Sequence, residues 1–476
     1  MFIKLMPSVL GAMASPIVAT FFFLSIASSP VIGQEPNFLA PQSTQAIGEK
    51  RLLMVAVRFP DAQPSQNLNG IRKRAVGGLN SYVKEQSYGQ ASIAADFKGW
   101  VTLPEPLSAY QVSPYNFKVD RGRVRKLVED TMSAVESTVD FSRYQHMLVI
   151  PGVQTMPGKG YGMLCYCANP GMLSGVSRRY VPRYETLRAR SGKEFSGGVF
   201  MGAENAHLGM FAHDYFHALG GIHEGKRLAP CLYDYRRQSD ESHGFPSGEI
   251  AFEHSSIYMG PWDIMSQHFV GQGEPPPGLS SFTKIRLGWI TTKEARLVRP
   301  GENALMYLSP LSLKGETLVA KIPLAGGQYY LIENRQPFGF DRVLPDSGMV
   351  ILRVNPEADE GFGTVELMNA DPEARHFSRA AFKAEEPRRN HYVDQRNGVA
   401  VIPLWKQDRE LGVLITTPGE SDAALKASQA IVKLMVRSDS APSGETAKVL
   451  REAIAAFKNF EFSKSRQTAR AILGDD

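Results

Sequence analysis

Apolar residues in the first half of the chain alternate between the spacing of strands and the spacing of helices. Continuous apolar runs at 52–57 and 147–150 are typical of buried strands, and helical spacing occurs at 71–83 and 119–139. Strands that alternate with helices predict an α/β domain. The Gly- and Pro-rich segment 151–176 is long for a connection, so we expect a functional loop near a cleft.

A further amphipathic helix is predicted close to the middle of the chain. Its apolar residues recur at steps of three and four: Leu208, Phe211, Ala212, Tyr215, Ala218 and Leu219. His213 and His217 lie beside this stripe and are four residues apart, so both imidazoles leave the same face of the helix. Gly220 allows a left-handed turn that ends the helix. The apolar run 197–201 before it predicts an edge strand that a substrate backbone could extend.

The pattern changes in the second half of the chain. Residues 291–418 read as short strands between Gly, Pro and Asn turns, which predicts a smaller, mostly-β accessory domain after a catalytic domain at 51–290. Residues 419–476 have helical spacing around a Ser- and Pro-containing break at 438–444, which predicts a short helical tail.

The N-terminus is typical of an exported protein. Residues 1–33 carry one charge, Lys4, followed by an apolar run at 18–27 and small residues, which predicts a signal peptide and a secreted protein. The alternative is an uncleaved segment that anchors the chain to a membrane. Residues 34–50 form a short polar lead. The net charge of +5 in 476 residues implies no nucleic-acid surface, and the oligomeric state does not follow from the sequence.

The chain has three cysteines: Cys165, Cys167 and Cys231. They are too few for a disulfide scaffold. In an oxidising compartment we expect Cys231 to form a disulfide with Cys165 or Cys167.

The chemistry centres on His213, Asp214, His217 and His223. Three histidines at these spacings around a glycine can hold one zinc ion, which keeps a fourth position for water. A carboxylate beside the metal then takes the proton of that water. Glu is the usual residue after the first histidine of this motif. Asp214 is therefore expected to act as the general base, with its carboxylate one C–C bond, about 1.5 Å, short of the position that a Glu carboxylate would reach. Four further histidines lie between residues 207 and 268: His207, His243, His254 and His268. Their spacings are not those of metal ligands, so they are interpreted as surface residues or as groups that surround the site.

Several segments together resemble the immune inhibitor A family of secreted zinc metallopeptidases. In chain order they are VRFPD at 57–61, KEQSYG at 84–89, GWVTLP at 99–104, FAH at 211–213, LYD at 232–234, GPWDIMS at 260–266, KIRLGW at 284–289 and YLIENRQ at 330–336. The resemblance covers about residues 51–355. It implies a metzincin-like catalytic domain with an active-site helix and with Met265 in a turn beneath the zinc.

The sequence departs from this family in two places. Asp214 replaces the motif glutamate, and residues 221–229 look inserted before the LYD motif. Spacing from the helix makes His223 the third zinc ligand, whereas the flanking LYD motif would make it Cys231. We favour His223 because the glycine turn restricts the path of the chain and imidazole is the commonest ligand of catalytic zinc.

These observations predict a secreted zinc endopeptidase that acts on protein or peptide substrates through a zinc-bound water, with Asp214 as a shortened base. Two alternatives stay open: a zinc-binding pseudopeptidase that binds peptides without efficient cleavage, and a secreted adhesion or structural protein without metal. Cleavage specificity and calcium binding do not follow from the sequence.

Overall fold

The computed structural model describes residues 37–110, 119–156, 159–160, 165–176, 181–240, 254–440 and 443–474. The predicted signal peptide at 1–33 lies outside these residues. Within them, no helix combines the length and apolar character needed to span a membrane.

A mixed sheet organises the first half of the chain. Within the described residues it has five strands in the order β2 (Ala91–Thr102), β1 (Gly48–Arg58), β3 (His146–Pro151), β9 (Gly198–Gly202) and β6 (Cys165–Asn169). The first four are parallel, and β6 runs antiparallel to β9. The α/β character expected from the sequence is therefore confirmed. The prediction that 197–201 forms an edge strand is wrong, because β9 pairs on both sides and β6 lies at the edge.

Both faces of this sheet are covered, which explains the continuous apolar run in β1. Leu52, Met54 and Ala56 belong to one hydrophobic cluster, and the alternate residues of the run belong to another. The first cluster includes residues of α1 (Leu68–Arg72), of the π-helical turn Lys73–Gly78, of α2 (Leu79–Gln86) and of α5 (Leu208–Gly220). Residues of α3 (Leu107–Tyr110) and α4 (Arg121–Val135) belong to the second cluster.

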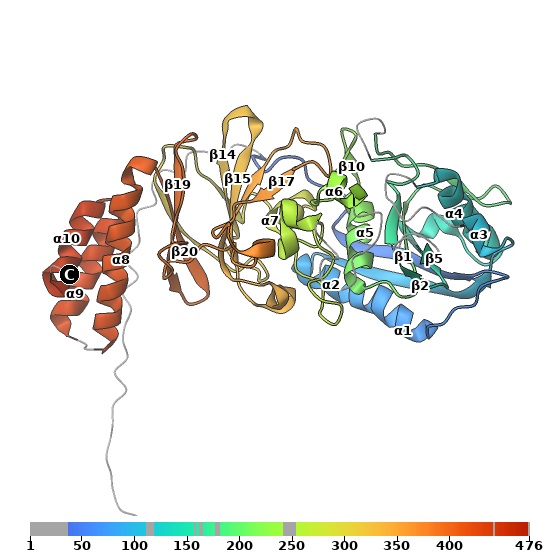
Figure 1. Cartoon of the computed structure of the whole chain (residues 1–476), viewed down its shortest axis with the longest axis horizontal. Helices are drawn as coiled ribbons and strands as arrows, with labels where there is room; N and C mark the ends of the chain where they lie inside the picture. The colour runs from blue at the N-terminus through green and yellow to red at the C-terminus, as the bar shows by residue number, and fades with distance from the viewer. Residues whose placement is uncertain are drawn as a thin grey trace, which may run out of the picture. The chain divides into compact units, whose positions relative to one another are not determined.

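The mostly-β character predicted after residue 290 is also present (Figure 1). One sheet has the order β12 (Ala295–Leu297), β14 (Val319–Pro323), β15 (Tyr329–Arg335), β16 (Gly348–Val354) and β17 (Val365–Leu367). A second has the order β13 (Ala304–Leu308), β20 (Glu410–Thr416), β19 (Val399–Gln407) and β18 (Tyr392–Asp394). A single hydrophobic cluster contains residues of both sheets. Residues 37–476 form one compact unit, so the domain boundaries near 290 and 418 stay predictions.

The helical tail consists of α8 (Pro418–Ser440), α9 (Gly444–Lys458) and α10 (Phe462–Leu473), shown in red in Figure 1. Their apolar faces share a cluster with Ile402, Leu404 and Leu414 of the second β-sheet. Short elements complete the described chain: β4 (Thr155–Met156), β5 (Lys159–Gly160), β7 (Leu187–Arg188), β8 (Glu194–Phe195), β10 (Ile222–His223), β11 (Lys226–Arg227), α6 (Tyr235–Asp240), α7 (Ser281–Arg286), and several 3₁₀ turns.

Candidate metal centre

Helix α5 presents the two histidines of the predicted metal motif. The His207 imidazole caps its N-terminus by accepting a hydrogen bond from the Gly209 N–H at 3.0 Å. Four residues of the predicted apolar stripe, Phe211, Ala212, Tyr215 and Leu219, are buried in the core beside the sheet, and Leu208 is partly buried against them. The left-handed residue that ends the helix is Gly221 (φ 72°) rather than Gly220.

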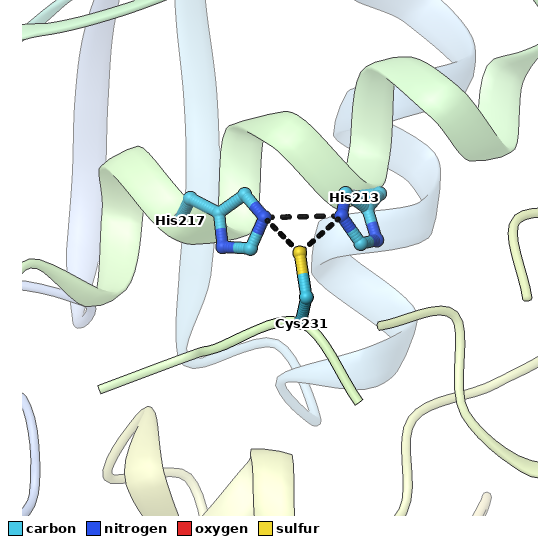
Figure 2. A group of neighbouring side chains, drawn as sticks. All are labelled: His213, His217 and Cys231. Carbon is cyan, nitrogen blue, oxygen red and sulfur yellow. Dashed lines mark hydrogen bonds between the residues drawn. The ribbon is translucent and has the colours of Figure 1, made fainter. Parts of the chain in front are cut away.

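His213, His217 and Cys231 form a compact group of possible metal ligands (Figure 2). The Nε2 atoms of the two histidines are 3.0 Å apart, and Cys231 Sγ lies 3.5 Å from His213 Nε2 and 3.4 Å from His217 Nε2. All three side chains are buried, with at most 3% of each residue exposed. The cluster could hold a metal ion.

Backbone carbonyls fix the orientation of both imidazoles. His213 Nδ1 lies 3.0 Å from the Ile264 carbonyl oxygen, and His217 Nδ1 lies 2.6 Å from that of Ala229. A carbonyl can only accept, so each Nδ1 carries the proton and each neutral ring presents a lone pair at Nε2. Two such lone pairs facing each other across 3.0 Å are unfavourable unless a cation lies between them. Nδ1–H bonds of this kind are also typical of metal-bound histidine.

The distances also fit a tetrahedral ion. Zinc bonds of about 2.05 Å to nitrogen and about 2.3 Å to sulfur predict N–N and N–S separations of about 3.4 Å and 3.6 Å. The observed separations of 3.0, 3.4 and 3.5 Å are within about 0.4 Å of these values. The cluster therefore needs only a small expansion to accept zinc.

His223, favoured as the third ligand from its spacing, is not brought to this cluster. Strand β10 pairs with β11 as a short hairpin, which places the His223 side chain at the surface, where it is 48% exposed and 3.8 Å from Glu224. The apparent insertion 221–229 forms this hairpin, and the chain then returns to bring Cys231 to the two histidines. The position next to the LYD motif was therefore the better guide to the third member of the group.

The predicted disulfide is not present. All three cysteines are free thiols. The thiol of Cys231 faces the histidines, whereas Cys165 and Cys167 lie in β6, where they pair in register with residues of β9.

Asp214 is buried, and its carboxyl group is not a member of the ligand group. The backbone N–H of Cys167 in β6 donates a hydrogen bond to it. Burial raises the pKa of Asp214 to about 8, although the positive charge of Arg227 and the Cys167 hydrogen bond act in the opposite direction. The carboxyl group of Asp214, the predicted general base, therefore contacts β6, the edge strand of the sheet.

The turn at 260–266 contacts the cluster through its backbone. Ile264 accepts the bond from His213, and the Met265 carbonyl accepts a 2.8 Å bond from the Leu232 N–H, next to Cys231. Met265 is fully buried. This turn therefore supports both the helix ligand and the loop that carries the thiol.

Other groups surround the cluster, among them His268, which the sequence analysis interpreted as a surface or surrounding residue. The Tyr233 hydroxyl lies 3.2 Å from Cys231 Sγ, and the His268 ring meets the His213 ring edge to face at 4.4 Å between centroids. Tyr233 is part of the LYD motif at 232–234, so this motif could have marked it as a residue near the cluster. Glu360 approaches Cys231 from 129 residues away, and no local pattern marks it.

No protein-family model matches the sequence, and no curated protein matches it.

Proposed function

We propose that the chain binds one zinc ion through His213, His217 and Cys231. The observation that carries this proposal is the pair of Nε2 atoms, 3.0 Å apart, whose rings are both held by Nδ1–H bonds to carbonyls. Two imidazoles and one thiol suit zinc, whereas magnesium and calcium prefer oxygen ligands.

The function that this site supports best is hydrolysis of peptide bonds by a zinc endopeptidase. Three protein ligands leave one coordination position open, as in catalytic zinc sites. Zinc bound there would polarise a carbonyl and activate water. The ordered motifs shared with the immune inhibitor A family favour a protein or peptide substrate, and the N-terminal sequence favours secretion. The Asp214 carboxyl group, on the same helix as two ligands, is the proposed proton acceptor.

A second candidate is a pseudopeptidase that binds zinc and peptides without cleaving them. The contacts of Asp214 favour it, because its carboxyl group is buried and already accepts a bond from the Cys167 N–H. A carboxyl group held there, and one methylene shorter than glutamate, reaches less far towards a water on the metal.

Cleavage of an unfolded protein by zinc-loaded enzyme separates the two candidates. For a peptidase we expect slow, chelator-sensitive cleavage that falls about 100-fold or more in Asp214→Ala, since general-base catalysis contributes about 10²–10⁴-fold. Glu224→Gln is the matched control because this acidic side chain is exposed, and its activity should equal that of the wild type. Zinc-loaded wild type without turnover on any peptide, together with an Asp214→Glu variant that gains it, would establish the pseudopeptidase. A protein that binds no zinc would contradict both candidates.

A further inference from the structure

We propose that Glu360, in the loop between β16 and β17, is a positioning residue that holds Cys231 in place as a metal ligand. The β-rich half of the chain would then complete a metal centre whose other ligands lie on α5. This inference rests on the proposed zinc site. It adds that zinc binding there depends on Glu360, which lies far from the ligands in the sequence.

The Glu360 carboxylate receives hydrogen bonds from three residues of the segment that carries the thiol. Its Oε1 accepts from the Cys231 backbone N–H at 3.0 Å and from the Tyr235 hydroxyl at 2.7 Å. The Arg227 guanidinium forms a two-point contact, with Nε 2.9 Å from Oε2 and Nη2 bonded to Oε1. One carboxylate therefore fixes the backbone of Cys231 and the residues four positions on either side.

The loop that carries Glu360 is itself anchored to the same segment. The Lys226 ammonium donates to the Pro356 carbonyl at 2.9 Å, and the Tyr235 N–H donates to the Gly361 carbonyl at 3.1 Å. Gly361 has φ 78°, and a Cβ there would lie 2.2 Å from the Tyr235 ring, so no larger residue fits. Residues 355–364 and 226–235 therefore form one hydrogen-bonded unit.

The charges around the thiol give Glu360 a second effect. Arg227 Nη2 lies 3.9 Å from Cys231 Sγ, and the Arg227 and Glu360 side chains are only 2% and 10% exposed. Glu360 neutralises this buried guanidinium. Without the carboxylate, an uncompensated cation beside the sulfur would compete with the metal ion for the thiolate and repel it.

The test compares full-length Glu360→Gln with Glu357→Gln, which removes the same charge from an exposed position three residues away in the same loop. Zinc affinity is measured by competition with a chelator, and the thiolate-to-metal charge-transfer absorption is measured after loading with cobalt(II). We expect Glu360→Gln to lose about 10- to 100-fold in zinc affinity, the usual effect of removing an outer-shell partner, and to show a weakened absorption band. Glu357→Gln should match the wild type in both.

Tyr235→Phe keeps both buried charges and removes a hydroxyl that donates to Glu360 and also contacts the Cys231 thiol, so it provides a milder variant if Glu360→Gln fails to fold. It should lower zinc affinity by a smaller factor. Wild-type affinity and absorption in folded Glu360→Gln, or in Tyr235→Phe when Glu360→Gln does not fold, would overturn the inference. If Cys231→Ser also keeps wild-type zinc affinity, the proposed ligand set itself is wrong; if Cys231→Ser loses zinc, only the role of Glu360 is rejected.

Discussion

Two single variants, Cys231→Ser and His223→Ala, distinguish the two candidate residues for the third zinc ligand. Apparent zinc-binding free energies of four-ligand protein sites are about 10–16 kcal/mol, so one ligand accounts for about 2.5–4 kcal/mol. This corresponds to a loss of roughly 10²- to 10³-fold in affinity. Cys231→Ser should lose affinity by this factor because its Sγ lies within 3.5 Å of both Nε2 atoms. His223→Ala should stay within about twofold of the wild type, because the side chain is 48% exposed and outside the group.

The assay is competition for zinc with a chromophoric chelator at neutral pH, on mature protein that has first been stripped of metal. The unfolding midpoint of each metal-free variant serves as the control, because a loss of affinity counts only where the apoprotein is folded. If His223→Ala loses zinc while Cys231→Ser retains it, the spacing from the helix is the correct guide, and the arrangement of the hairpin at β10 and β11 must change when the metal binds.

Two further predictions concern stability rather than the metal. Arg335 is fully buried between Glu333 and Asp341, at 3.0 and 2.7 Å, so Arg335→Met leaves two carboxylates unpaired and should lower the free energy of unfolding by about 3–5 kcal/mol in urea titrations. The exposed control Arg375→Met should change it by less than about 0.5 kcal/mol, and equal values for the two variants would refute the argument. Burial lowers the pKa of His146 to about 3. Between about pH 6.5 and 3 this imidazole is therefore protonated in the unfolded chain but neutral in the folded protein. The free energy of unfolding falls as the pH falls through this window. At pH 5 the metal-free protein should have lost about 2 kcal/mol from this residue, and His146→Phe should reduce the pH dependence by that amount; an unchanged slope in the variant would contradict the assignment.

The local elements could be predicted from the sequence because they depend on residues close together in the chain. The apolar run 52–57 lies in β1, and the stripe that begins at Leu208 lies in α5. The four-residue spacing of His213 and His217 places both rings on one face through helix geometry alone. For the same reason, a first pair of possible metal ligands was identifiable without a structure.

The tertiary structure alone decided which residue joins that pair. The turn at Gly221 and the pairing of β10 with β11 direct His223 to the surface, and Cys231 arrives only after the chain has returned along α5. The order of the strands likewise decided that β6 rather than β9 is the edge strand of the first sheet. It also placed the Cys167 N–H of β6 against the Asp214 carboxyl group. Glu360 reaches Cys231 because the β16–β17 loop folds against the segment 226–235. Contacts over such sequence separations depend on the packing of whole sheets and loops, and local residue spacing carries no information about them.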